Sequence, residues 1–501
     1  MLLLMTDQQR WDSLGGSKRW PVETVNLDWL AKTGTVFSNA YTPSPSCVPA
    51  RASLLTGQDP WNHGILGMGG GQGPMGVGFE HTLPGELSAA GFHTHSVGKN
   101  HFFPQRARNG YDSVVLDESG RKEDPGFVSD YEAWFNRNKP ADVGFVDHGI
   151  GWNAHSARPY HAPEYLHQTN WTVNEALSFL ERRDPTSPFF LKVSFARPHS
   201  PYDPPAAYFD RYLASETPPA AIGDWASIHD VEADAAAEDA WRGRFPVEHI
   251  HRARAGYMGS INHIDHQIGR LFHAMRKMRI LDDTMILFLS DHGDMLGDHN
   301  LYRKTYGYEG SAHVPLIIRM PKPLGETRRL APEPVTLQDI MPTILSAVGL
   351  PVPDTVDGAS LLGHISPAGP DSPQEFVHGE HSTCYSTEQE MQYLTDGRWK
   401  YIWFPRLGTE QVFDLAHDPY EIHDLADSPD YAQETERWRK RLVNILAGRD
   451  AGLTRGDSLM NQQGRPYLVS PAYRRRMERC GLDWYRYRQP AVGRVPPLSG
   501  D

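Results

Sequence analysis

The stretch SCVPARASLLTGQ, residues 46–58, decides how the rest of the chain can be arranged. Pro49 suits the first helical position, where its missing N–H needs no partner, and Gly57 is placed to end the helix. The stretch therefore predicts a short helix with Cys47 at its N-terminus, facing free backbone N–H groups and the positive end of the helix dipole. Arg51 lies one helical turn further on, on the same face. A thiol beside a guanidinium at a helix N-terminus indicates a reaction centre for an oxyanion ester.

Taken alone, Cys47 also fits a second interpretation, that of a buried and inert free cysteine at the start of a helix. For an isolated cysteine we would prefer that interpretation. The reactive one depends on polar groups elsewhere in the chain that come together around this helix.

Composition limits the classes of partner. The chain has 501 residues and a formal net charge of −13, which disfavours nucleic acid or an anionic membrane as a partner. Cys47, Cys384 and Cys480 are too few and too far apart for a disulfide framework, which indicates a reducing compartment. The opening MLLLMTDQQR is too short for a signal peptide or a membrane span. We therefore expect a cytoplasmic protein, or a periplasmic or secreted one if the natural start lies upstream.

Residues 1–365 are predicted to form an α/β catalytic domain, in which a large mixed, mostly parallel sheet is sandwiched by helices. Residues 109–161 lack periodicity and are rich in aromatic side chains, histidine and glycine, so we expect a loop insertion that shapes the pocket. Strands are expected at residues 2–5, 36–41, 93–97, 188–195, 284–289 and 314–319, helices at 27–32, 83–90, 173–182, 249–278 and 337–348, a glycine-rich rim loop at 67–78 and an exposed helix at 231–239.

The pattern changes after a Pro/Gly/Ser-rich linker at residues 363–373. Short strands at 392–395, 399–404 and 411–415, followed by a helix at 434–446, predict a smaller α+β subdomain with an antiparallel sheet, residues 366–450. Residues 451–501 form a tail rich in Arg, Tyr and Pro. We expect this tail to wrap the body or a neighbouring subunit, and in the second case the protein would be a homo-oligomer.

Polar residues follow four of the predicted strands directly. In open α/β sheets the ligand crevice lies at the carboxyl ends of the strands, so these groups can converge on the Cys47 helix. Each of them alone could be a turn residue or a solvated charge, and their joint placement is what favours a site. The groups are Asp7 with Gln8, Lys99 with His101, His199, and Asp291 with His292.

The residue types indicate the chemistry of the site. Asp7, Gln8 and Asp291 supply hard oxygen ligands, which suit Ca²⁺ or Mg²⁺ better than a thiolate-bound zinc. Lys99, Lys304 and Arg51 concentrate positive charge in an acidic protein. That concentration indicates an anionic substrate.

At this point the sequence resembles the type I sulfatases of the alkaline-phosphatase-like superfamily. Residues 47–51, CVPAR, look like the family's C-x-P-x-R signature, with Ala50 where many members have Ser. The resemblance extends from Met1 to about Leu425 and leaves the tail uncovered. The other matching blocks, in order, are TDQQR (6–10), GKNH (98–101), RPH (197–199), SDHGD (290–294), Lys304, VTLQDIMPTIL (335–345) and DGRWKY (396–401).

The resemblance implies a role for each matched residue. Cys47 would be oxidised by a formylglycine-generating enzyme, and its hydrated gem-diol would attack sulfur. Asp7, Gln8, Asp291 and His292, with an oxygen of modified Cys47, would hold one divalent cation, Ca²⁺ being expected before Mg²⁺ or Mn²⁺. Gln8 and His292 stand where many members have Asp and Asn, which leaves the metal's identity open. Arg51 and His101 would orient and activate the gem-diol, Lys99 and Lys304 would bind sulfate oxygens, and His199 would protonate the leaving oxygen.

The leading hypothesis is a sulfuric ester hydrolase. A sulfated carbohydrate is slightly favoured over an aryl sulfate because of the aromatic- and His-rich insertion. The nearest alternative is a phosphonate monoester or phosphodiester hydrolase of the same superfamily. A non-catalytic sulfoglycan-binding protein with unmodified Cys47 is a third possibility, and a Cys-His hydrolase that uses the thiol directly is the weakest, because it leaves the paired carboxylates without a role.

Overall fold

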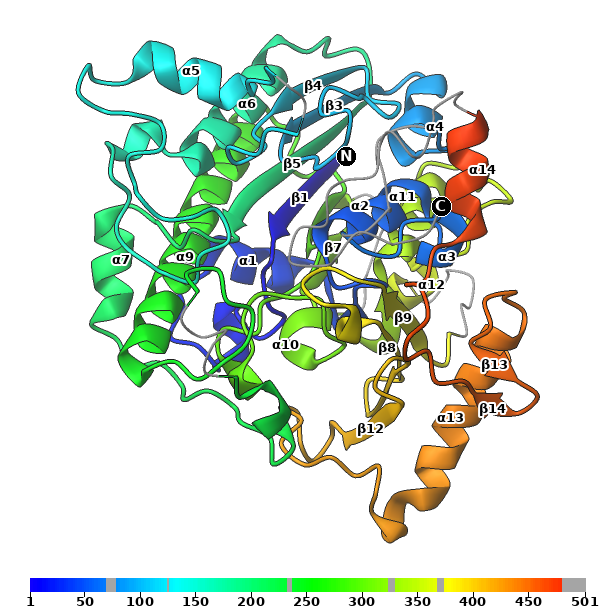
Figure 1. Cartoon of the computed structure of the whole chain (residues 1–501). Helices are drawn as coiled ribbons and strands as arrows, with labels where there is room; N and C mark the ends of the chain where they lie inside the picture. The colour runs from blue at the N-terminus through cyan, green and yellow to red at the C-terminus, as the bar shows by residue number, and fades with distance from the viewer. Residues whose placement is uncertain (69–77, 124–125, 232–236, 323–328, 367–373, 480–501) are drawn as a thin grey trace.

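A large twisted sheet forms the centre of the molecule (Figure 1). The computed structural model describes residues 1–68, 78–123, 126–231, 237–322, 329–366 and 374–479. The eight strands lie in the order β4-β3-β5-β1-β6-β7-β2-β8. β7 runs antiparallel to both of its neighbours, and the other neighbouring strands of this sheet pair in parallel, so the predicted mixed, mostly parallel sheet is confirmed. The strands are β1 Leu2–Asp7, β2 Thr35–Tyr41, β3 His93–Gly98, β4 Ser113–Leu116, β5 Phe189–Pro198, β6 Ile286–Ser290, β7 Leu316–Arg319 and β8 Leu330–Thr336.

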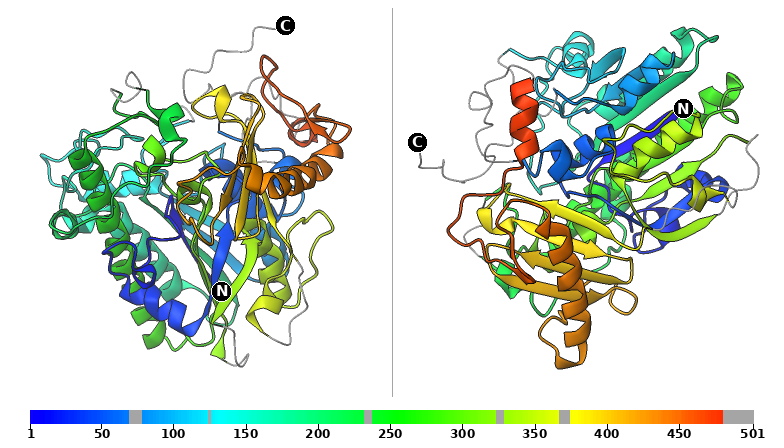
Figure 2. Two further views of the ribbon diagram at one scale, coloured as in Figure 1. Left: turned by 90° about the horizontal axis from the view of Figure 1, so that it is seen from below. Right: turned by 90° about the vertical axis from the view of Figure 1, so that its right-hand side faces the viewer.

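Helices cover both faces of this sheet, which explains the continuous apolar run of β1. Leu2 and Leu4 pack into the core on one face, and Leu3 and Met5 pack into the core on the other, because successive side chains of a strand point to opposite faces. Figure 2 shows helices on either side of the sheet. The first face is covered by α1 Val25–Thr33, α6 Gln168–Arg182 and α9 Val247–Lys277, and the second by α2 Cys47–Thr56, α4 Leu83–Ala89 and α11 Ile340–Ala347.

A second, four-stranded antiparallel sheet follows in the order β12-β11-β10-β9, as expected for the smaller subdomain. One of its faces packs on α13 through Trp438 and Leu442. It joins the main body by hydrogen bonds, for example from the Glu380 N–H to the Pro43 carbonyl at 2.9 Å. The elements are β9 Val377–His381, β10 Met391–Thr395, β11 Trp399–Phe404, β12 Thr409–Asp414 and α13 Ala432–Ala447.

The structure differs from the predicted elements in several places. The helix that carries Cys47 begins at Cys47 itself and ends at Thr56, so Pro49 occupies its third position rather than its first; the missing N–H is harmless there too. Part of the expected loop insertion forms the edge strand β4 and helix α5, Asp130–Asn138. Strands β8 and β9 are additional, and a short helix, α12 Leu362–Ile365, occupies the start of the predicted linker.

Part of the predicted tail packs on the body. Helix α14, Pro471–Arg479, lies against α3, Pro60–His63, and the Ser470 hydroxyl donates to the Trp61 carbonyl at 2.6 Å. Residues 480–501, which include Cys480, lie outside the described residues, as do 69–77 of the rim loop, 232–236 of the expected exposed helix and 367–373 of the linker. Within the described ranges, no helix is both long and apolar enough to cross a membrane.

Candidate active site

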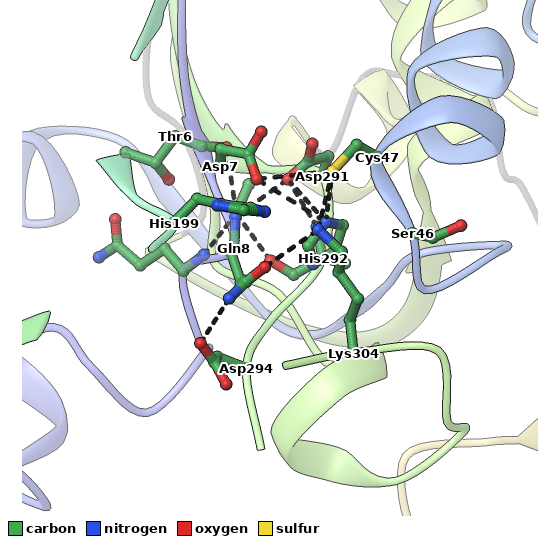
Figure 3. Close-up of polar contacts among 12 residues, drawn as sticks. Thr6, Asp7, Gln8, Ser46, Cys47, His199, Asp291, His292, Asp294 and Lys304 are labelled. Carbon is green, nitrogen blue, oxygen red and sulfur yellow. Dashed lines mark hydrogen bonds and ion pairs between the residues drawn. The ribbon is translucent and has the colours of Figure 1, made fainter. Parts of the chain in front are cut away.

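The carboxyl ends of β1, β3, β5 and β6 meet at one edge of the main sheet. Figure 3 shows Asp7, His199 and Asp291, which end or follow three of these strands, gathered beside Cys47 at the start of α2. Gly98 allows the chain to turn directly after β3, because its φ is +94° and a Cβ there would lie 2.0 Å from the Ser194 carbonyl oxygen. The structure brings together these predicted residues: Asp7, Gln8, Cys47, Arg51, Lys99, His199, Asp291, His292 and Lys304.

Cys47 is fully buried at the start of α2 and is surrounded by polar groups. Its Sγ lies 3.1 Å from Lys304 Nζ, 3.2 Å from His292 Nε2, 3.7 Å from Asp7 Oδ1 and 3.9 Å from Lys99 Nζ. Burial and the Asp7 carboxylate raise the pKa of the thiol, but Lys304, Lys99 and His292 outweigh them and hold it well below its ordinary value. These contacts are typical of a reactive thiol rather than of an inert buried cysteine.

Arg51 ties the two carboxylates of the site together. It is 2% exposed, and its Nε donates to Asp291 Oδ2 at 2.8 Å while Nη2 donates to Asp7 Oδ2 at 3.0 Å. Its Nη1 donates to the Lys99 carbonyl at 2.7 Å and to Ser194 Oγ at 3.0 Å. The planar guanidinium thus reaches four acceptors, two of them on strands β1 and β5 and two directly after β3 and β6, whereas a lysine ammonium has only three N–H donors.

Four buried side chains could hold a metal ion. One ligand atom from each of Asp7, Cys47, Asp291 and His292 lies within 4.8 Å of the others. His292 Nδ1 lies 2.8 Å from the Gly293 carbonyl, which only accepts, so Nδ1 carries a proton and Nε2 is the ring nitrogen that faces the cluster. Burial and Asp7 raise the pKa of Asp291, and a divalent cation would relieve this crowding of negative charge. The donor set therefore fits a hard cation.

Gln8 lies beside these four groups, with its amide already engaged. Its Oε1 accepts from Lys304 Nζ at 3.1 Å, and its Nε2 donates to Asp294 Oδ2 at 2.5 Å. Asp294 also accepts from the Tyr202 hydroxyl at 2.6 Å and from the backbone N–H groups of Leu296 and Arg303. Asp294 was not predicted as a site residue. Its place two positions after His292, in SDHGD, was the signal that could have identified it.

His199, the residue after β5, lies beside the cluster, and its backbone N–H donates to the Asp7 carbonyl at 3.0 Å. Its Nδ1 is 2.8 Å from the Ser200 carbonyl and carries the proton, so Nε2 is the atom free to exchange one. Burial, followed by Lys304 and Lys99, holds the pKa of His199 well below its ordinary value, although Asp7 opposes them. Trp152, from the insertion, packs with its ring centroid 5.8 Å from that of His199 and 5.9 Å from Lys99 Nζ.

His101 is held through its backbone. Its backbone N–H donates to Glu118 Oε1 at 2.9 Å, its φ is +59°, and within the described ranges neither a hydrogen bond nor an ion pair joins it to the other predicted residues. Its Nδ1 is buried with no hydrogen-bond partner in the described part of the chain. Glu118, whose pKa burial raises to about 8, also accepts from the Asn100 N–H and thereby fixes this loop.

The smaller sheet also reaches the site. His381, at the end of β9, lies with its Nε2 2.9 Å from Oγ of Ser46, the residue just before Cys47. His381 Nδ1 lies 2.8 Å from the Ser382 carbonyl, and burial lowers the pKa of His381 to about 4. His381 is therefore neutral and pairs with Ser46, the residue directly before α2. No motif of the sequence indicated it, because strand β9 was not predicted.

Comparison with known proteins gives consistent results along nearly the whole chain. The family model "Sulfatase" matches residues 1–350, and the model "N-sulphoglucosamine sulphohydrolase, C-terminal" matches residues 297–447. An arylsulfatase of Clostridium perfringens is 41% identical over 472 residues, covering 92% of this chain and 97% of its own. A choline-sulfatase of Rhizobium meliloti is 30% identical over 447 residues, covering 86% and 82%. The crystal structure of a phosphonate monoester hydrolase of Agrobacterium radiobacter superposes with a TM-score of 0.75 at 25% identity, covering 89% of this chain and 95% of the other.

Proposed function

The chain belongs to the sulfatase family and is a sulfuric ester hydrolase, and we propose that a formylglycine made from Cys47 is its nucleophile. The main support for this proposal is the position of Cys47 at the N-terminus of α2, where its Sγ lies 3.1 Å from Lys304 Nζ and 3.2 Å from His292 Nε2. The hydrated aldehyde supplies the attacking hydroxyl group and a second hydroxyl through which the sulfate is released.

We propose that Asp7, Asp291, His292 and the modified side chain of residue 47 hold one divalent cation, Ca²⁺ before Mg²⁺ or Mn²⁺. The support is the buried cluster itself, in which two carboxylates, a histidine and residue 47 offer ligand atoms within 4.8 Å of one another. A cation there supplies charge neutralisation and lowers the pKa of the bound nucleophile. Gln8 is a further candidate ligand through Oε1, which retains a lone pair beside its bond to Lys304.

The chain's own residues account for binding and proton transfer. Lys99 and Lys304 approach Cys47 Sγ from different segments and can each bind a sulfate oxygen. His199 presents Nε2 to the site and would donate a proton to the leaving oxygen. Burial, and after it Lys304 and Lys99, lowers the pKa of His199, and a bound sulfate would offset the part that comes from the two lysines. Arg51 keeps Asp7 and Asp291 in position and, together with His101, would orient and activate the gem-diol.

The preferred substrate is proposed to be a sulfated carbohydrate, with aryl sulfates also accepted. The insertion that shapes the site supports this choice.

A formylglycine-generating enzyme would act on Cys47 during maturation. The location would be the cytoplasm, and any homo-oligomer would form through the tail. Neither nucleic acid nor a membrane surface is expected as a partner, given a net charge of −13.

A phosphonate monoester hydrolase is the second candidate, because the Agrobacterium enzyme of that activity superposes over 89% of this chain with a TM-score of 0.75. Initial rates with 4-nitrophenyl sulfate and with 4-nitrophenyl phenylphosphonate distinguish the two. We expect a higher kcat/KM for the sulfate, and the reverse order would favour the second candidate.

The intact mass of the peptide that contains Cys47 tests the nucleophile. Conversion of a thiol to an aldehyde lowers that mass, and Cys47→Ala should abolish turnover of 4-nitrophenyl sulfate. An unmodified peptide from protein of full activity would contradict the proposal.

A further inference from the structure

A pocket of about 370 Å³ opens next to the active site and takes no part in the chemistry described above. Its size falls at the lower end of the range for small-molecule sites. Most of its wall comes from residues 119–160 of the insertion, and the remainder from the start of α6, the end of β5 and the loop that follows β5. The lining residues that matter here are Tyr131, Phe145, Val146, Trp152, Arg197 and Asp203.

Trp152 lines this pocket and also packs against the active site. The ring of Trp152 packs against His199, the proposed proton donor, and lies within 5.9 Å of Lys99 Nζ, and the same side chain lines the pocket. Pro201, two residues after His199, also lines it. A sulfate ester bound at Lys99 and Lys304 would therefore direct its alcohol part past His199 toward this pocket.

The walls of the pocket are mainly aromatic. Phe145 packs on Tyr131 with ring centroids 5.6 Å apart, and the Tyr160 hydroxyl lies 3.2 Å from that of Tyr131. Val146, on the rim, is 69% exposed, which is unusual for so apolar a side chain. Flat aromatic walls contact the face of a ring over a larger area than they contact an open chain.

The charges of the pocket cancel. Arg197 and Asp203 are the charged residues of its described lining, and they pair with each other, Arg197 Nε donating to Asp203 Oδ1 at 2.7 Å. His148 Nδ1 accepts from the Ile150 N–H at 3.1 Å, and burial lowers the pKa of His148, so this side chain is neutral. A cationic or an anionic group would find no unpaired counter-charge among these residues.

We propose that this pocket binds the alcohol part of the substrate, and that this part is an uncharged six-membered ring, either aryl or sugar. The inference rests on the proposed function, since it takes the sulfate to lie between Lys99 and Lys304. Selection is by shape and by the absence of charge, so an open-chain alcohol gains little from the pocket.

The test compares ring-bearing and ring-free esters in Phe145→Ala and Phe145→Leu. Leucine keeps much of the apolar volume and removes the flat face, so it remains informative if the alanine variant fails to fold. We expect KM for 4-nitrophenyl sulfate, glucose 6-sulfate or both to rise about threefold to tenfold. KM and kcat for ethyl sulfate should change less than about twofold, a difference that a general structural role would not produce. The matched control is Tyr165→Ala, an aromatic residue that is 54% exposed and lies outside the lining.

The outcomes separate this inference from the proposed function. An increase confined to the aryl ester, or to the sugar ester, supports the pocket and identifies its ring. An equal increase in KM for ethyl sulfate, or an unchanged KM for every ester, overturns it. Wild-type protein that hydrolyses none of the esters would refute the proposed function alone; binding of phenol or glucose to the Cys47→Ala protein, measured by ligand-observed NMR, would then test the pocket independently. Ring binding that Phe145→Ala weakens would support it, and binding that is absent or unchanged would overturn it.

Discussion

Replacement of Arg51 by methionine should destabilise the protein far more than the loss of a surface ion pair. Methionine has a similar length and removes every hydrogen bond that the guanidinium donates. The acceptors Asp7 Oδ2 and Asp291 Oδ2, now 3.0 and 2.8 Å from the guanidinium, would remain buried as carboxylates without it.

The size of the loss follows from the burial of this network. Arg51, Asp7 and Asp291 are all at most 2% exposed. Removing one member of a buried charge network costs about 3–5 kcal/mol, because the desolvated partner keeps its charge. The exposed pair of Arg437 and Glu434, whose side chains are 49% and 21% exposed, provides the comparison, and its loss should cost less than about 1 kcal/mol.

Urea unfolding followed by circular dichroism measures both effects, in buffer that contains a chelator. Arg51→Met combined with Asp291→Asn should recover at least about 1 kcal/mol relative to the sum of the single variants, because the charge left behind is removed as well. Added Ca²⁺ should reduce the cost of Arg51→Met, since a cation neutralises the same carboxylates. A loss for Arg51→Met no larger than that for Arg437→Met would refute the reasoning.

Three further measurements test other parts of the structure. Burial, and secondarily His93, lowers the pKa of His95 to about 4. Between about pH 6.5 and pH 4 the unfolded state therefore binds a proton that the folded state does not, so the stability that this group contributes falls as the pH drops. The difference in unfolding free energy between wild type and His95→Phe should change by roughly 2–3 kcal/mol between pH 7.5 and 4.5, and a constant difference would contradict the shift. Gly98→Ala should cost about 2–5 kcal/mol in urea unfolding, because its φ is +94° and the new methyl group meets the Ser194 carbonyl, whereas unchanged stability would mean that the turn can relax. Ca²⁺ at a hundred times its Kd should stabilise the wild type by about 2.7 kcal/mol over chelated protein, and this gain should nearly vanish in Asp291→Asn; an equal gain in both would locate the ion elsewhere.

The sequence was most informative where backbone rules determine the outcome. The apolar run of β1 had to be a buried strand, and parallel strands place their carboxyl ends at one edge, so Asp7 and Asp291 could be brought together before any coordinates were known. Gly57 ends α2 in the left-handed region, as its place in the motif predicted. The position of these residues relative to one another thus followed from topology alone.

Contacts that depend on tertiary packing could not be predicted in this way. Trp152 lies in a segment without periodicity, and nothing local indicated that its ring would pack on His199. Strand β9, VHGEH, contains few strand-forming residues and is stabilised by its pairing with β10, so His381 could not be placed near Ser46. The block GKNH identified His101 as a candidate, but the hydrogen bond from its backbone N–H to Glu118, which the block does not predict, helps to fix where it lies.

The way the two sheets meet has a consequence for the ancestry of the gene. Lys400, on β11, is fully buried and forms ion pairs with Glu309 of α10, Glu309–Ala312, and with Glu421, at 3.2 Å in the second case. A recombination event with a crossover between β8 and β9 would combine halves from different parents and leave one of these charges unmatched in the interior. Because Lys400 and Glu421 both lie after that crossover, the charge at risk is the pair of Lys400 with Glu309, in parents that differ at residue 309. The two halves are therefore expected to descend together and to diversify through surface insertions such as the one that carries Trp152.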